Sequence, residues 1–133
     1  MAVVEITREN FEEVVTGNPT VIMDFWAPWC GPCRSFGPVF EAAAEQHPDI
    51  VFGKVNSDVQ QELSGAFNIR SIPYLMVMRE KVIVFAQAGA LPPDALESVI
   101  QQARALDMAQ VHKEIEEEQQ QAAAGKQQAV GSK

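Results

Sequence analysis

The chain has 133 residues, 47% of them hydrophobic and 21% charged, which is enough for one domain with a hydrophobic core. Its 18 acidic and 10 basic residues give a formal net charge of -8 at pH 7, and the acidic excess is present both before and after residue 106. An acidic surface repels phosphate groups, so we expect neither nucleic acid nor an anionic membrane as a partner.

The N-terminal residues 1–10 lack the basic start and the long apolar stretch of a targeting signal. The longest apolar-rich run, residues 20–29, contains an aspartate and is too short to span a bilayer. We therefore expect a cytoplasmic protein. Thiols are normally kept reduced in that compartment, so a lone cysteine pair is expected to be catalytic or metal-binding rather than a permanent bridge.

Apolar periodicity and turn residues divide the first 106 residues into alternating strands and helices. The predicted elements, in chain order, are a strand over 2–6, a helix over 8–16 capped by Thr7, a strand over 20–26, a helix over about 33–46 that contains Pro38, a strand over 50–55, a helix over 59–67, strands over 74–78 and 82–86 joined by a turn at 79–81, and a helix that begins at Pro92. This order predicts an α/β fold in which helices cover both faces of a mixed central sheet.

Beyond Leu106 the composition changes to Glu, Gln, Ala and Lys, which favour helix but cannot form a core. We expect residues 1–106 to form the domain and residues 107–133 to be a polar extension, partly helical or disordered. In this interpretation the last helix continues to about Ala124, Gly125 stops it, and the remainder is disordered. Val111 and Ile115 are too few apolar positions for a sustained coiled coil.

Cys30 and Cys33 are the only cysteines, and they lie in the stretch WCGPC directly after the strand predicted over 20–26. Three explanations compete: a metal clip, a structural disulfide and a reversible redox pair. A zinc site usually needs four ligands at short spacing, whereas His47 and His112 are far apart in the sequence. A structural disulfide stabilises more when it closes a longer loop, and this loop is short. The redox explanation fits best.

Redox chemistry also explains the spacing, because two intervening residues let the sulfurs reach bonding distance. Cys30 is predicted at or just before the first residue of a helix, where unpaired N–H groups and the helix dipole favour the thiolate, the nucleophile in disulfide exchange. Cys33, one turn further along, is expected to be more shielded and suited to resolve a mixed disulfide. Pro32 supports the helical turn, and Gly31 lets another backbone approach.

The stretch DFWAPWCGPC closely resembles the thioredoxin family, and the resemblance extends over about residues 1–106. Its further matches are Asp24 six positions before Cys30, Pro38 inside the helix, Lys54 in GKVNSD, Pro73 in IRSIPYL and Gly89 in AGAL. The resemblance implies a thioredoxin-like three-layer sandwich and a protein disulfide reductase. It also implies a cis peptide bond between Ile72 and Pro73, packed against the cysteine pair.

Site roles follow from these matches. A buried carboxylate is costly unless it is used or paired, so Asp24 is expected to have a raised pKa and to act as general base or proton shuttle for Cys33. Lys54 is either an ordinary half-buried lysine or a residue that tunes Asp24. The residues expected to contact substrate are Trp29, Gly31, Pro32, Ile72, Pro73 and Gly89.

Two departures from the family pattern concern the partners and the hairpin. Tyr74 stands where thioredoxins usually carry a small threonine, and the turn at 79–81 lacks the usual glycine. We expect a monomer that acts on disulfide-containing proteins without a metal. The chain shows no cofactor-binding motif, so an NADPH-dependent thioredoxin reductase is expected to recycle it. The alternative is a thioredoxin-fold adaptor or chaperone-like binding module, which the polar extension favours slightly.

Overall fold

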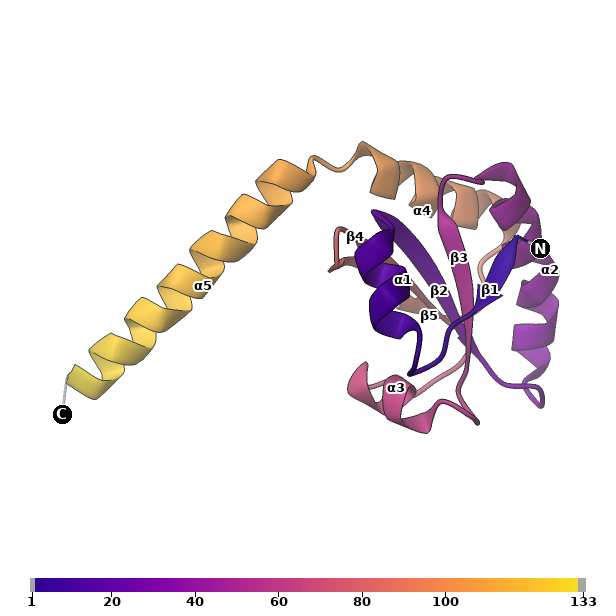
Figure 1. Cartoon of the computed structure of the whole chain (residues 1–133), viewed down its shortest axis with the longest axis horizontal. Helices are drawn as coiled ribbons and strands as arrows, with labels where there is room; N and C mark the ends of the chain where they lie inside the picture. The colour runs from indigo at the N-terminus through magenta and orange to yellow at the C-terminus, as the bar shows by residue number, and fades with distance from the viewer. Residues whose placement is uncertain (1, 132–133) are drawn as a thin grey trace.

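A computed structural model describes residues 2–131, with side chains described for residues 2–124. Its elements are β1 (Val3–Glu5), α1 (Phe11–Gly17), β2 (Thr20–Trp26), α2 (Gly31–Gln46), β3 (Val51–Asn56), α3 (Gln61–Ala66), β4 (Tyr74–Arg79), β5 (Val82–Ala88), α4 (Pro93–Ala105) and α5 (Met108–Gly131). The strands form one sheet in the order β1-β3-β2-β4-β5 (Figure 1). The first three strands of that order run parallel, and β4 and β5 are antiparallel to their neighbours. The predicted mixed sheet is confirmed.

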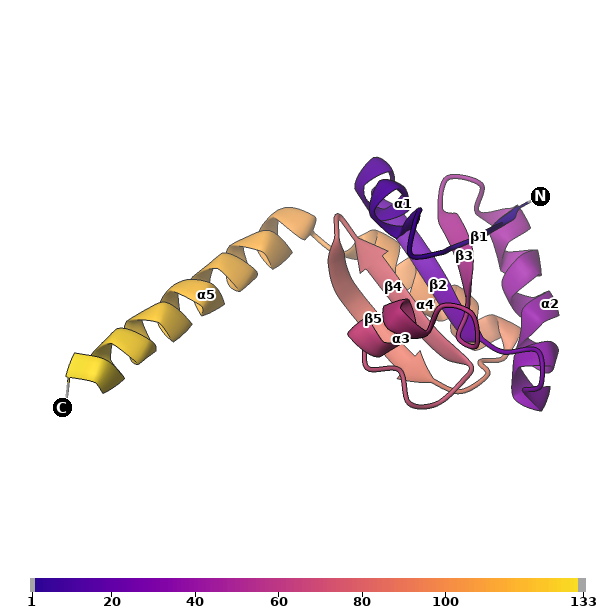
Figure 2. The same ribbon diagram turned by 60° about the horizontal axis from the view of Figure 1, so that its bottom comes forward.

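Two apolar clusters hold the three layers together, one on each face of the sheet. Phe36 and Phe40 of α2 and Ile100 of α4 pack on one face. Val15 of α1 and Leu63 of α3 belong to the cluster on the other face. Helices therefore cover both sides of the sheet, as the element order predicts (Figure 2).

The central strand β2 assigns its side chains to the two faces by simple alternation. Met23 and Phe25 belong to the cluster under α1 and α3, whereas Ile22 belongs to the cluster under α2 and α4. Asp24 lies two residues from Ile22 and therefore faces the α2 side. Along β3, Phe52 belongs to the α2 cluster, so Lys54 faces the same side as Asp24. The strand register thus places both charged residues under α2.

Helix starts differ from the predicted ones by up to three residues. The first helix begins at Phe11 rather than at residue 8, although Thr7 does organise the turn before it. The Thr7 N–H donates to Asn10 Oδ1 at 2.8 Å, and the Asn10 N–H donates back to Thr7 Oγ1 at 3.2 Å. The second helix begins at Gly31, two residues earlier than predicted, with Cys30 as its N-cap. This confirms the expected position of Cys30 just before the first helical residue.

The chain after Pro92 forms two helices instead of the predicted single one. Leu106 has extended dihedral angles that end α4, and Asp107 Oδ1 accepts a hydrogen bond from the Gln110 N–H at 3.3 Å at the start of α5. Arg79 Nη1 donates to the carbonyls of Ala103 and Leu106, so the end of α4 has a side-chain partner from the sheet. Figure 1 shows α5 leading away from the sheet.

The expected helix stop at Gly125 is wrong, because α5 is helical through Gly131. A glycine inside a helix costs about 1 kcal/mol relative to alanine, which disfavours the helix without ending it. Met108 is buried, whereas residues 116–124 are all exposed. The division into residues 1–106 and a polar extension stays a prediction.

The turn between β4 and β5 explains how the hairpin closes without the usual glycine. Glu80 and Lys81 both have positive φ, 50° and 69°, and Arg79 is paired with Val82 across the sheet. Two central residues with positive φ define a type I′ turn, the conformation that suits the twist of a hairpin. For a side chain other than glycine or asparagine this conformation is strained. The strain concentrates at the two residues of this turn.

Substituting Lys81→Gly should therefore raise the free energy of unfolding by about 0.5–1 kcal/mol, because glycine adopts positive φ without a Cβ penalty. Urea denaturation at pH 7 measures the change. Lys81→Ala is the matched control, since it removes the same charge and keeps the Cβ. An equal gain in both variants would trace the effect to charge and contradict the backbone explanation.

Deleting residues 110–133 should leave the melting temperature within about 4 °C of the full chain, because the deletion removes little buried surface. Among the described residues, it breaks the exposed contact between His112 Nε2 and Glu80 Oε1, at 3.1 Å. Calorimetry and light scattering measure stability and mass. A change in mass would show that α5 associates with a second chain, and a large loss of stability would show that it belongs to the domain.

Candidate active site

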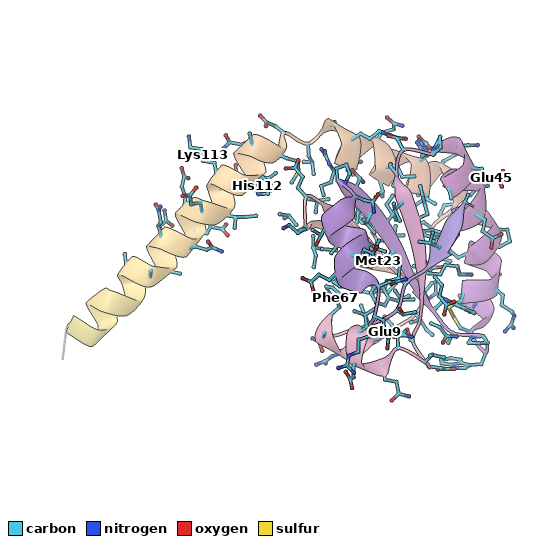
Figure 3. All side chains as sticks on the ribbon, in the orientation of Figure 1. Glu9, Met23, Glu45, Phe67, His112 and Lys113 are labelled. Carbon is cyan, nitrogen blue, oxygen red and sulfur yellow. A yellow bond between two sulfur atoms is a disulfide. The ribbon has the colours of Figure 1, made fainter. Side chains whose placement is uncertain are left out.

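The two cysteines lie at the junction between the central strand β2 and α2. They form a disulfide (Figure 3). Their Cα atoms are 5.2 Å apart, within the usual range for a disulfide. Both residues are 4% exposed and pack with Ala27, against Trp26 and Ile72. Because their exposure is equal, burial does not distinguish Cys33 as the more shielded residue, contrary to the sequence-based expectation.

Hydrogen bonding does distinguish the two sulfurs. Cys30 is the N-cap of α2, and its Sγ accepts the Cys33 N–H at 3.2 Å. That N–H is one of the helix-terminal donors that have no acceptor within the helix. Pro32 stands in the first turn, where its missing N–H costs nothing. The positive end of the α2 dipole therefore points at the sulfur of Cys30.

The loop before β4 forms the second wall of the site. The peptide bond between Ile72 and Pro73 is cis, as the resemblance implies. The Ile72 carbonyl oxygen lies 3.8 Å from Cys30 Sγ. The Pro73 carbonyl accepts the N–H of Gly89 at 2.8 Å, and Gly89 has φ of +105°, which L side chains rarely adopt. Gly89 thus belongs to the same wall, through its backbone.

Trp29, directly before Cys30, is 68% exposed and is held in place by a residue that sequence reasoning missed. Its indole Nε1–H lies 3.1 Å from both carboxylate oxygens of Asp58. Asp58 follows β3, and its own N–H donates to Asn56 Oδ1 at 3.0 Å. No local pattern marks this aspartate, because its partner is 29 residues away. An exposed tryptophan with an indole donor was the available signal.

Asp24 is fully buried, and neither of its carboxylate oxygens has a hydrogen-bond partner among the described residues. Burial raises the pKa of Asp24 to about 7, and the Lys54 ammonium partly offsets this. Lys54 is the β3 neighbour of Asp24 in the strand register. Its Nζ lies 4.4 Å above the ring of Trp26, which is half-buried. The structure therefore brings Asp24 and Lys54 together.

Metal-ligating side chains do not cluster in the described part of the chain, where no group of three His, Cys, Asp or Glu residues could hold an ion. His47 instead contacts Glu97 through Nε2 at 2.8 Å and Arg104 through Nδ1 at 2.8 Å. Among residues 2–131 no helix has the length and apolar content needed to cross a membrane.

Comparison with known proteins agrees with this geometry. The family model described as thioredoxin matches residues 2–102. A Streptomyces coelicolor protein named "Putative thioredoxin 2" is 60% identical over 119 residues, which cover 90% of this chain and 89% of that protein. The thioredoxin of Porphyra purpurea is 40% identical over 102 residues, covering 75% of this chain and 95% of that protein.

Solved structures show the same architecture. The short form of thioredoxin f from spinach chloroplast superposes with a TM-score of 0.72 at 30% identity, over 77% of this chain and 94% of that one. The Plasmodium falciparum thioredoxin gives a TM-score of 0.70 at 32% identity, over 74% of this chain and 97% of that one. The three-layer sandwich is thus the thioredoxin fold. The chain belongs to the thioredoxin family of thiol–disulfide oxidoreductases, with the Cys30–Cys33 disulfide as its redox-active pair.

Proposed function

We propose that the reduced protein transfers two electrons to protein disulfides, with Cys30 as the attacking thiolate. Cys30 attacks one sulfur of the substrate disulfide, forms a mixed disulfide and releases the other substrate sulfur as a thiolate. Cys33 then loses its proton and attacks Cys30 Sγ. The second substrate thiol leaves, and the Cys30–Cys33 disulfide remains.

One observation carries this order of events: Cys30 Sγ sits at the N-terminus of α2 and accepts the Cys33 N–H at 3.2 Å. The hydrogen bond and the helix dipole both favour negative charge on this sulfur in the reduced protein. When Cys33 later attacks Cys30 Sγ, the bond between Cys30 and the substrate breaks, the substrate sulfur leaves as a thiolate, and Cys30 stays in the new disulfide.

Asp24 is the proposed proton acceptor for Cys33. Its position on the α2 face of β2 and the absence of a hydrogen-bond partner support this role. A carboxylate with a pKa of about 7 can exchange a proton near neutral pH, whereas an ordinary aspartate is already ionised there. Lys54, which lowers that pKa, is proposed to tune the exchange.

Substrate is proposed to lie against the wall formed by the loop before β4. The Ile72 N–H makes no hydrogen bond within the described residues, so it is open to an extended segment in the manner of a strand. The remaining proposed contacts are Trp29, Gly31, Pro32, Pro73 and Gly89. Tyr74 does not enlarge this wall, because its ring packs toward Phe25 at 6.3 Å between centroids.

The family implies disulfide substrates and a reductase, and we propose an NADPH-dependent thioredoxin reductase for the second role. Cytoplasmic location is proposed because a reducing compartment keeps such a pair in its dithiol form. Trapping with Cys33→Ser, which cannot resolve the mixed disulfide, would identify the substrates bound to Cys30.

Alkylation of the reduced protein at pH 7 should modify Cys30 at least about tenfold faster than Cys33, because only Cys30 receives the helix-terminal N–H. Mass spectrometry of peptides after timed iodoacetamide quenching measures both rates. Cys33→Ser should still form mixed disulfides with insulin, and Cys30→Ser should not.

Equal labelling rates would contradict the proposed order of attack. Full cellular complementation by the double variant Cys30→Ser, Cys33→Ser would instead support the adaptor function, since that protein cannot transfer electrons.

Asp24→Asn should change both stability and catalysis. Between about pH 4 and pH 7 the folded wild type holds a proton on Asp24 that the unfolded chain has lost, so its stability falls as pH rises through this window. A pKa raised from 3.8 to about 7 corresponds to a loss of about 4 kcal/mol. The variant should lack this fall, exceed the wild type in stability at pH 8 and resolve mixed disulfides more slowly.

Urea denaturation from pH 4 to pH 8 and stopped-flow fluorescence from pH 6 to pH 9 measure these effects. Glu41→Gln, which neutralises an exposed carboxylate on α2, is the control. Unchanged resolution rates across that range would remove Asp24 from proton transfer even if the stability effect is found.

A further inference from the structure

Arginines near the dithiol differ from the other arginines in what they contact. The chain has five arginines, all within the described residues. Three contact carboxylates: Arg8 with Glu62 at 2.7 Å, Arg104 with Asp49 at 2.6 Å and Arg79 with Glu80 at 4.0 Å. The two without a carboxylate contact in the described part of the chain are Arg34 and Arg70. With 18 acidic residues against 10 basic ones, two such arginines close to one site are unexpected.

Arg34 is fixed directly beside Cys30. It follows Cys33, and its backbone N–H donates to the Cys30 carbonyl at 3.2 Å. Its Nη1 donates to the Pro28 carbonyl at 3.0 Å, and its Nη2 lies 3.8 Å from where a Cβ on Gly31 would be. The guanidinium therefore lies over the loop that carries Trp29. One of its five N–H donors serves this loop, and the exposed side chain leaves others for a ligand.

Arg70 adds a second exposed cation on the opposing loop. It lies two residues before Ile72, whose carbonyl contacts Cys30 Sγ, and its Nε donates to Asn68 Oδ1 at 3.4 Å. Asp58, which lies at the same surface, accepts the Trp29 indole hydrogen bond with both oxygens. Arg34 and Arg70 thus place two cations on the loops beside the dithiol, in a chain of net charge -8.

We propose that Arg34 is a specificity-determining residue that selects disulfides flanked by aspartate or glutamate side chains, with Arg70 in a supporting role. The proposal rests on the proposed function, in which Cys30 attacks the substrate disulfide. A planar guanidinium with free donors can bind a carboxylate in bidentate fashion. An aspartate or glutamate next to the disulfide of a peptide held against Cys30 would present such a carboxylate. At 0.15 M salt, charges beyond about 8 Å are screened, so the distant acidic residues oppose this selection weakly.

The test uses two synthetic peptides, each closed by one disulfide, with two glutamates beside it in one and two lysines in the other. The measured quantity is the ratio of kcat/KM for the glutamate peptide to that for the lysine peptide, at 0.15 M salt. Arg34→Glu should lower this ratio about fivefold or more, since an attraction becomes a repulsion. Arg34→Lys keeps the charge but loses the bidentate geometry, so it should lower the ratio, though less than Arg34→Glu does. Lys113→Glu on α5 introduces the same charge change at a distance and should leave the ratio unchanged (Figure 3).

The ratio separates selection from reactivity. If Arg34 acts only by favouring the Cys30 thiolate, Arg34→Glu slows both peptides equally, and the proposal is wrong. An equal fall of the ratio in Lys113→Glu would trace the effect to net charge and also overturn it. If the wild type reduces neither peptide nor insulin, the proposed function itself fails. If the wild type reduces the peptides well but Arg34→Glu leaves the ratio unchanged, the proposed function stands and only the selectivity proposal is wrong. Circular dichroism confirms that each variant is folded.

Discussion

The hydrogen bond from the Cys33 N–H to Cys30 Sγ depends on where β2 ends and α2 begins, and the chemistry of the site depends on that hydrogen bond. A shift of one residue in the start of α2 would move the N-cap off the cysteine and leave the sulfur without its helix-terminal donor. The start is held from both sides. β2 is paired with β3 through Trp26 and with β4 through Phe25, and Pro32 prefers the first turn of a helix. The Ala27 carbonyl also accepts the Cys30 N–H at 3.2 Å.

The buried Asp24 works against the stability of the same junction. It occupies a central strand position between two apolar faces, where a neutral side chain would stabilise the fold more. The carboxyl can stay protonated up to about neutral pH, so the loss of stability from its ionisation is complete only above that pH. This cost agrees with the proton-transfer role proposed for Asp24, since β2 would pair equally well with an apolar side chain there. Burial raises the pKa of Asp24, and the Lys54 ammonium on the next strand partly offsets that rise.

Local patterns predicted the element order and the disulfide pair, because alternation along β2 and the spacing of Cys30 and Cys33 are properties of short segments. The resemblance supplied the cis bond before Pro73, which no local pattern encodes. Features set by distant partners were missed. Asp58 accepts the hydrogen bond of Trp29, which lies 29 residues earlier in the chain. The interruption between α4 and α5 coincides with hydrogen bonds from Arg79 to the end of α4. At Lys81, the hairpin geometry overrides the preference of the residue for negative φ.

The position of α5 bears on how the extension relates to the dithiol. The dithiol follows the C-terminal end of β2, and because β4 is antiparallel to β2, the Glu80 turn lies at the other end of the sheet. His112 of α5 contacts Glu80, so α5 starts at the end remote from Cys30, and Figures 1 and 2 show it leading away from the sheet. The 119 residues shared with the Streptomyces coelicolor protein exceed the length of the predicted domain, whereas the Porphyra purpurea match spans 102. The match to that relative therefore includes part of the extension, and α5 is placed where it leaves access to the dithiol open.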